Sequence, residues 1–119
     1  MILSDKDLKK RIKEKSLLIK PFDRACVQPS TYDLHLSDEF RLFTNHETAG
    51  YIDPGFKGHI TFEMSNLNKV PIILYPGMKV AQICFFVMSS KVDRPYGTAG
   101  NKYQGQKGPT ESRVWKDFG

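Results

Sequence analysis

The segment TAGYIDPGFKGHITFE, residues 48–63, contains a tight turn followed by an alternating stretch. Pro54 presets φ for one turn position and Gly55 supplies the positive φ of the next, so Asp53-Pro54-Gly55 predicts a tight turn. After Gly58 apolar and polar residues alternate, which predicts a strand with one apolar face. The residues expected on that face are Ile60, Phe62 and Met64.

Two carboxylates accompany this turn and strand. Glu63 lies on the polar face of the predicted strand with Thr61, and Asp53 opens the turn before it. A carboxylate in mid-strand, shortly after a second carboxylate, is unusual if its only task is solubility. We predict that Glu63 acts as a general acid and base and that Asp53 helps to hold the substrate. The alternative, that Glu63 is a partly exposed strand residue, fits the residues alone equally well.

The composition is that of one globular domain spanning residues 1–119. The chain is 39% hydrophobic and 26% charged, which suits a soluble protein with a single core. The net charge of +5 suits an anionic partner. The one dense basic run, Lys9-Lys10-Arg11, lies on a predicted helix, so we interpret it as a solvated helix face. We expect no nucleic-acid partner, because such proteins cluster basic residues with interleaved aromatics.

The cysteine usage indicates the cytoplasm. Cys26 and Cys84 are far apart in the sequence and form no Cys-x-x-Cys motif. Cys84 lies in an apolar stretch, where a free cysteine is usually a small core residue. The sequence also shows no signal peptide and no long apolar run, so no membrane segment is expected.

The remaining elements are predicted from capping, alternation and turns. Ser4 is a good N-cap and Asp7 a capping-box acid, which predicts a helix over residues 5–15. Short strands are predicted over residues 17–19, 32–36, 40–43, 72–74 and 80–88. Several short strands separated by Pro and Gly turns favour a mainly β sandwich or barrel over a doubly wound sheet.

The composition changes again near the end of the chain. Residues 96–113 are rich in Gly, Lys, Gln and Tyr. Composition alone favours a flexible tail. A segment of this kind can instead become ordered over a ligand as a lid, with Lys contacting phosphate and Tyr stacking on a ring.

Several chemistries lack their residues here. The three histidines and two cysteines do not have the spacing of a zinc hydrolase or zinc deaminase site. A Walker loop, a Gly-x-Ser-x-Gly elbow and a Rossmann fingerprint in its strand-turn-helix context are also missing. What remains is carboxylate catalysis with water as the nucleophile.

Four motifs together resemble a known family. They are VQPSTYDL (residues 27–34), HETAGYIDPGF (46–56), PGM (76–78) and YQGQKGP (103–109). With the first residues MILSDKDL, they are similar to the dCTP deaminase family of the trimeric dUTPase superfamily. RPYG (residues 94–97) and the YQGQ tail are most similar to the bifunctional branch, which converts dCTP to dUMP.

The resemblance implies a mainly β fold, a distorted dUTPase-like β-barrel of the β-clip type with a short N-terminal helix. It implies a homotrimer with active sites between subunits and residues 96–119 as a lid. The expected reaction is hydrolytic deamination of dCTP at cytosine C4, giving dUMP plus diphosphate or, alternatively, dUTP. Mg²⁺ would accompany the triphosphate and no zinc would be used. dUTP and dTTP are further nucleotides that the family would bind.

The resemblance also assigns residues. Glu63 corresponds to the glutamate that takes a proton from the attacking water and passes it toward the leaving ammonia. Asp53 corresponds to the residue at the deoxyribose and Thr61 to the position that meets the base. The loop that positions base and water corresponds to His46, Thr48 and Ala49. The tail residues that close over sugar and triphosphate correspond to Tyr96, Lys102 and Gln106.

One departure from the family is large. Family members carry several strands and a Gly-Arg/Lys-Ser-Ser-x-x-x-Arg phosphate motif at a place where Asn45 here runs directly into His46. Each charge-assisted hydrogen bond lost with that motif is worth roughly 1.5–3 kcal/mol. The missing strands would also leave sheet edges unpaired. The second hypothesis is therefore a catalytically inactive nucleotide-binding or regulatory remnant.

Overall fold

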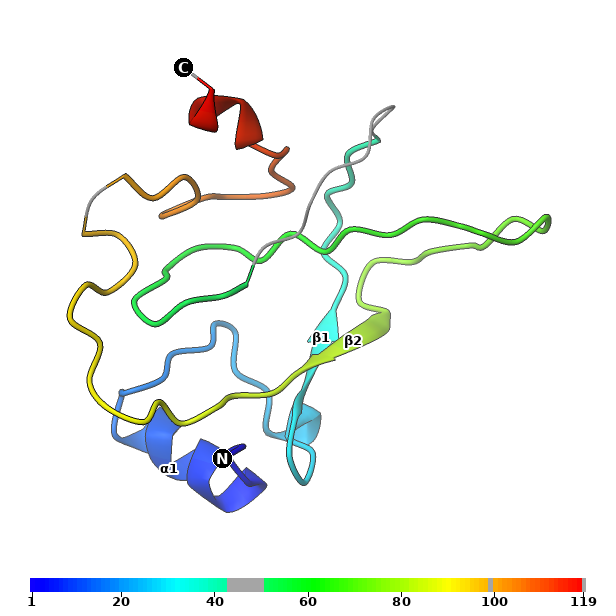
Figure 1. Cartoon of the computed structure of the whole chain (residues 1–119). Coiled ribbons are helices and arrows are strands. Elements are labelled where there is room, and N and C mark those ends of the chain that lie inside the picture. The colour runs from blue at the N-terminus through cyan, green and yellow to red at the C-terminus, as the bar shows by residue number, and fades with distance from the viewer. Residues whose placement is uncertain (43–50, 99, 119) are drawn as a thin grey trace. The chain divides into compact units, whose positions relative to one another are not determined.

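The computed structural model describes residues 1–42, 51–98 and 100–118 (Figure 1). The regular elements within them are α1 (Asp5–Lys13), η1 (Arg24–Cys26), β1 (Tyr32–His35), β2 (Lys79–Ile83) and η2 (Val114–Asp117). The chain divides into two compact units. The first unit is Met1–Asp38 with Leu74–Ser90, and the second unit is Glu39–Ile73 with Lys91–Gly119.

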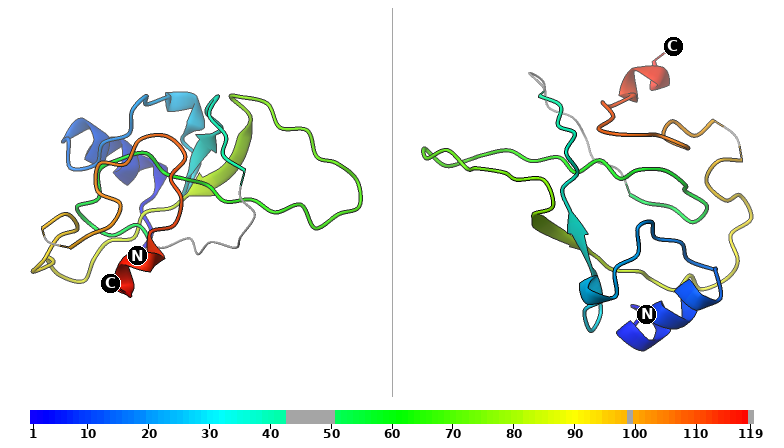
Figure 2. Two further views of the ribbon diagram at one scale, coloured as in Figure 1. Left: turned by 90° about the horizontal axis from the view of Figure 1, so that it is seen from above. Right: turned by 180° about the vertical axis from the view of Figure 1, so that it is seen from behind.

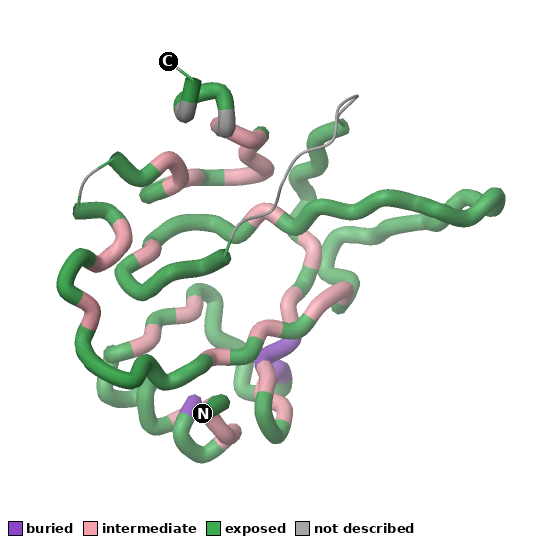
Figure 3. Tube along the Cα trace, viewed as in Figure 1, coloured by how far each residue is buried: buried purple, intermediate pink, exposed green. Residues whose placement is uncertain are grey.

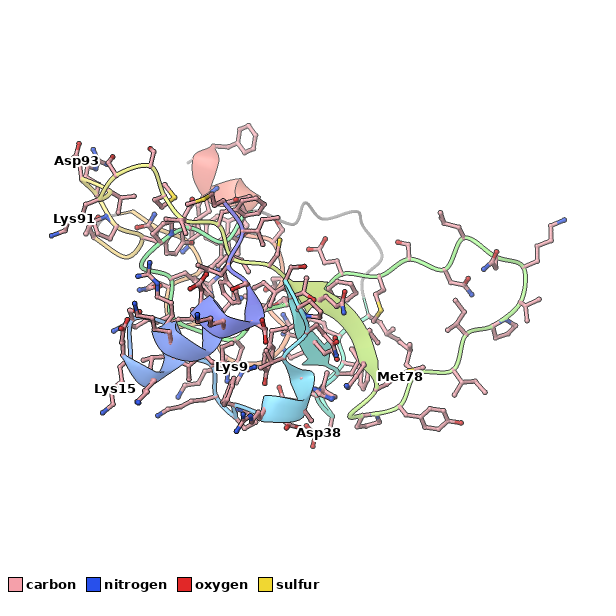
Figure 4. All side chains as sticks on the ribbon, turned by 90° about the horizontal axis from the view of Figure 1, so that it is seen from below. Lys9, Lys15, Asp38, Met78, Lys91 and Asp93 are labelled. Carbon is pink, nitrogen blue, oxygen red and sulfur yellow. The ribbon has the colours of Figure 1, made fainter. Side chains whose placement is uncertain are left out.

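The predicted N-terminal helix is confirmed, and it is two residues shorter than expected. Ser4 adopts an extended conformation and its hydroxyl oxygen accepts a hydrogen bond from the Asp7 N–H at 3.3 Å. The helix ends at Lys13, because Lys15 has a φ of +58° that helical backbone does not allow. Leu8 is the one buried residue of α1. Figure 4 shows Lys9 on this helix and Lys15 just beyond it.

The predicted strand after Gln28 is also confirmed. The Gln28 N–H donates to the Thr31 carbonyl at 2.9 Å and closes the turn that leads into β1. β1 pairs antiparallel with β2, with a register shift between Leu34 and His35. The pairing continues beyond β1, since the Leu36 N–H donates to the Met78 carbonyl at 2.9 Å.

The burial of Asp33 was not predicted. Only 6% of this residue is exposed, although it lies between apolar neighbours on a strand. Its carboxylate accepts hydrogen bonds from the Gln82 amide at 2.9 Å, the Lys79 ammonium at 2.9 Å and the Gln28 amide at 3.0 Å. These donors hold the pKa of Asp33 at about 2, below its ordinary value of 3.8. The buried charge is therefore fully paired, as burial of a carboxylate requires.

The core of the first unit is small. Leu8, Cys26 and Tyr32 are buried, and the buried positions are purple in Figure 3. Half-buried apolar residues from the N-terminal segment, β1 and residues 83–85 pack against them. The Tyr32 hydroxyl accepts a hydrogen bond from the Asp23 N–H at 2.9 Å, and burial raises the pKa of this phenol. The prediction that Cys84 is a core residue was wrong: Cys84 is exposed. Ile83 and Phe85 on either side of it are half-buried, so Cys84 faces away from the core.

Several predicted strands do not form. Residues 17–19, 40–42, 60–64 and 72–74 have no strand structure, and residue 43 lies outside the described residues. The stretch over residues 80–88 is a strand only as far as Ile83. The described residues contain one two-stranded sheet, which is less β structure than the mainly β prediction. An alternating sequence becomes a strand only when a neighbouring strand supplies the hydrogen-bonding ladder.

The second unit has little regular structure and no core among its described residues. Its one named element is η2, and none of its described residues is buried. Figure 2 shows residues 62–73, in green, as a loop that is open in the left view and narrow in the right view. Across the described residues, no helix is long and apolar enough to span a membrane.

Candidate active site

A tail and a loop that are distant in the sequence lie side by side in the second unit. We define the tail as residues 95–113 and the loop as residues 53–61. The Tyr96 N–H donates to the Pro54 carbonyl at 2.8 Å, the Gly105 N–H to the Lys57 carbonyl at 2.7 Å, and the His59 N–H to the Gln106 carbonyl at 2.9 Å. The interpretation of this segment as a flexible tail, drawn from composition, does not describe the structure.

Two glycines of the loop make this approach possible. Gly55 has a φ of +99°, and a Cβ added there would lie 2.7 Å from the Tyr96 carbonyl oxygen. At Gly58, with a φ of +155°, a Cβ would lie 3.0 Å from the Gln106 nitrogen. Tail backbone therefore occupies the space that a side chain would need at both positions. The predicted turn over Asp53-Pro54-Gly55 is confirmed, since the Phe56 N–H donates to the Asp53 carbonyl at 3.2 Å.

Side chains add to the backbone contacts. The Gln104 amide accepts from the Lys57 N–H at 2.9 Å and donates to the Gly55 carbonyl at 3.0 Å. The ring of Tyr96 packs edge-on against Phe56 with 5.7 Å between centroids. The Tyr96 hydroxyl accepts from the Tyr103 N–H at 3.1 Å. The backbone N–H, the ring and the hydroxyl of Tyr96 are thus all held by contacts within the second unit.

His59 is bonded to the tail at three points. Besides the backbone N–H bond to Gln106, the His59 carbonyl accepts from the Gln106 side-chain amide at 2.5 Å. The third bond joins the Gly108 N–H to Nδ1 of His59 at 2.8 Å. Because Nδ1 accepts, the proton of a neutral ring is on Nε2. Two residues after His59, Oγ1 of Thr61 accepts a hydrogen bond from the Thr110 N–H at 3.1 Å.

The predicted site residues that the structure describes all belong to this second unit. Asp53 and Thr61 come from the two ends of the loop, and Glu63 follows two residues later. Asp53 and Glu63 are exposed, and the Glu63 carboxylate has no hydrogen bond or ion pair within the described residues. The tail contributes three half-buried residues, which are Tyr96, Lys102 and Gln106. Predicted residues that lie outside the described residues are His46, Thr48 and Ala49.

Gln106 has a buried acceptor that is not used. Its Nε2 donates to His59, while its Oε1 is buried and has no hydrogen-bond partner among the described residues. A buried acceptor left unpaired costs free energy, about 1–3 kcal/mol. Its position on the tail, next to the loop, makes it available to an N–H or O–H donor of a ligand.

Arg113 was missed by the sequence interpretation. Its guanidinium donates to the Lys102 carbonyl and lies 5.8 Å from the centroid of the Tyr103 ring, which is a cation–π contact. Its N–H also donates to the Tyr103 hydroxyl at 2.8 Å. Other residues that join tail to loop and were not predicted are His59, Gln104 and Thr110. The sequence signal that could have indicated this packing is the pair Gly55 and Gly58 of the loop, where tail backbone takes the place of a side chain.

The first unit offers a weaker candidate. A hollow of about 390 Å³ is lined by Asp33, Lys79, Val80, Ala81 and Gln82. Both carboxylate oxygens of Asp33 already accept hydrogen bonds from protein donors, so this hollow presents no free carboxylate. Within the ranges that the structure describes, no group of three or more His, Cys, Asp or Glu side chains could hold a metal ion.

This chain is similar along its length to several proteins that are named as dCTP deaminases. The Salinispora arenicola protein "dCTP deaminase, dUMP-forming" is 35% identical over 186 aligned residues, covering 99% of this chain and 97% of the relative. Proteins of the same name from Salinispora tropica and Mycolicibacterium smegmatis are each 34% identical over 186 residues. These two alignments also cover 99% of this chain, with 97% and 98% of the relatives.

The alignments are longer than this chain. With 186 aligned positions against 119 residues, at least 67 positions of each alignment have no residue here. The sequence profile described as "dCTP deaminase-like" matches this chain in two parts, residues 2–49 and 44–88. The two matches meet where the missing segment was predicted, between Asn45 and His46. The chain belongs to the dCTP deaminase-like family.

Proposed function

We propose that this protein is a dCTP deaminase of the dUMP-forming type. The observation that carries the proposal is the match to dUMP-forming relatives along 99% of the chain. In this reaction one water replaces the amino group at cytosine C4 and releases ammonia, and a second water cleaves the triphosphate between its α- and β-phosphates. The products are dUMP, ammonia and diphosphate, and the enzyme is a hydrolase that supplies dUMP in pyrimidine deoxynucleotide metabolism.

Glu63 is the proposed catalytic residue. Its carboxylate takes a proton from the water that attacks C4 and returns it to the departing nitrogen. Support comes from its position two residues after Thr61, whose hydroxyl contacts the tail, and from the absence of any described partner that would occupy it. Thr61 meets the base in this proposal and Asp53 meets the deoxyribose.

The tail is the proposed lid over the nucleotide, as part of one domain spanning residues 1–119. Tyr96 and Gln106 are fixed against the loop, and the unpaired Oε1 of Gln106 suits a donor of the sugar or base. Lys102 supplies positive charge for the phosphates. We assign the positioning of base and water to the three site residues outside the described ranges, His46, Thr48 and Ala49.

The substrate in this proposal is dCTP with its Mg²⁺. The ion bridges phosphate oxygens and neutralises charge, a usual role for this hard cation. The complete fold would be a distorted dUTPase-like β-barrel assembled as a homotrimer, and a cytoplasmic location stays a prediction from cysteine usage.

The test is to incubate the purified chain with dCTP and Mg²⁺ and to separate the nucleotides by ion-exchange chromatography. A dUMP peak with diphosphate supports the proposal, and Glu63→Gln should abolish it while nucleotide binding by calorimetry is kept. A dUTP peak would make the chain a simple deaminase. Unchanged dCTP from a folded protein that binds dCTP or dTTP would support the second candidate, an inactive binding remnant, which the 67 or more unmatched positions favour.

A further inference from the structure

Residues 62–73 of the second unit form an extended arm with exposed apolar side chains. We call this segment the arm. Its large apolar residues are between 46% and 94% exposed, and they are Phe62, Met64, Leu67, Val70, Ile72 and Ile73. In Figure 4 the side chains along this loop, which leads back toward Met78, spread around it. Apolar residues at this density and exposure mark an interaction surface.

The backbone of the arm is also unpaired. Within the described residues, no backbone-to-backbone hydrogen bond involves residues 62–73. The tip alone is held, by the Asn66 side-chain amide donating to the Val70 carbonyl at 2.9 Å and accepting from the Asn68 N–H at 3.0 Å. Open N–H and C=O groups beside alternating apolar residues are a template for an added strand.

The family comparison indicates what fits this template. The relatives have at least 67 aligned positions with no counterpart here, and the two family matches meet at residues 44–49. The arm itself, within the matched residues 44–88, is retained. A fold that keeps the arm and lacks a stretch of its relatives' chain is expected to expose the surfaces that the stretch would cover.

We propose that the arm binds a second polypeptide that carries the segment missing from this chain. The partner is a dCTP deaminase-like subunit, or part of one, that adds strands to the arm and covers its apolar side chains. Because Glu63 lies on the arm, this binding also fixes the proposed catalytic carboxylate. That last consequence rests on the proposed function, whereas the binding itself does not.

The first experiment measures binding at the arm. The probe is the part of the Mycolicibacterium smegmatis relative that has no counterpart here, produced as a fusion to a soluble carrier and added to the full 119-residue chain. We expect amide hydrogen exchange across residues 62–73 to slow by about tenfold or more, because the amides gain a ladder. The carrier alone should have no effect. Unchanged exchange would overturn the proposal, and so would protection that grows with the chain's own concentration, since a second copy would then cover the arm.

A matched pair of variants locates the surface. Ile72→Asp places a charge on the arm and should abolish the protection by the probe. Leu18→Asp makes the same change at a residue of similar exposure, 63% against 58%, in the first unit and should leave the protection intact. Docking on the arm would be contradicted if both variants lost the protection equally, or if neither variant lost it.

Turnover separates this inference from the proposed function. With the probe bound we expect dUMP formation to rise by roughly a hundredfold or more, within the range that a correctly placed general acid–base group supplies. Binding without any dUMP would retain the docking surface and overturn the proposed function. Full turnover by the chain alone, with no binding of the probe, would retain the function and overturn the inference.

Discussion

Replacing His59 tests whether the tail is held as the structure shows. His59→Gln moves the side-chain acceptor away from the position of Nδ1, so the Gly108 N–H loses its partner at 2.8 Å. His59→Asn is the matched control, because its Oδ1 can occupy the position of Nδ1. The two backbone contacts between His59 and Gln106 are available to both variants.

The size of the effect follows from one hydrogen bond. A typical bond contributes about 0.5–1.5 kcal/mol net, which corresponds to an increase of about 2- to 13-fold in the population of released tail. His59 is exposed, so we expect a value in the lower half of that range. His59→Asn should stay within about twofold of the unmodified chain.

Limited proteolysis measures this population. Trypsin cleaves after Lys107, an exposed residue beside Gly108, and cleavage there requires the tail to open. Cleavage after the exposed Lys69, on the arm, serves as an internal reference, because no hydrogen bond or ion pair joins Lys69 to the described residues of the tail. Equal rates for His59→Gln and His59→Asn would refute the reasoning. A parallel rise in cleavage at Lys69, which is open in the folded chain, would indicate a difference in protease activity and not release of the tail.

Three further predictions concern the loop, the proposed catalytic residue and the first unit. Gly55→Ala should destabilise the contact between tail and loop by about 1–3 kcal/mol, because the new Cβ lies 2.7 Å from the Tyr96 carbonyl oxygen and φ is +99°. Trypsin cleavage after Lys107 measures this release of the tail, and an unchanged cleavage rate would contradict the packing. Glu63→Gln should abolish dUMP formation and leave hydrogen exchange of the first unit unchanged; residual turnover near the starting level would reassign the catalytic role. The folded pKa of Asp33, about 2, is below its ordinary 3.8, so its stabilisation is fully present above about pH 4 and is lost as pH falls through about 2. Thermal unfolding across this range should show that loss, and Asp33→Asn should reduce both the stability at neutral pH and its decline toward pH 2.

The parts of the fold that were predictable are those fixed by short-range chemistry. The helix was located by Ser4, whose hydroxyl accepts a hydrogen bond from the Asp7 N–H, and by Asp7, whose carboxylate accepts one from the Ser4 hydroxyl. The turn before β1 was located by Gln28-Pro29-Ser30 for a similar reason. The pairing of Asp33 could not be predicted, because two of its donors, Lys79 and Gln82, are 46 and 49 residues away.

The failed strand predictions have a related cause. The alternation over residues 60–64 states only that one face is apolar, whereas a strand also needs a neighbour to bond with. The site shows the same division. The family motif indicated Glu63, Asp53 and the tail residues, but the bond between His59 and Gly108 depends on a contact across 49 residues. Composition indicated flexibility in the tail, whose backbone instead packs closely against the loop at Gly55 and Gly58.

The pairing of β1 with β2 has a consequence for how the first unit tolerates a change in chain length. The Leu36 N–H donates to the Met78 carbonyl and the Gly77 N–H donates to the Leu36 carbonyl, which closes a loop of the residues between Leu36 and Met78, and the unmatched positions fall within that loop. Closure entropy grows only with the logarithm of loop length, so adding 67 residues to this loop would change its cost by about 0.9 kcal/mol. The stability of the β1–β2 pairing thus depends only weakly on the length of the chain between the two strands. Evolution can shorten or lengthen that chain without unfolding the first unit.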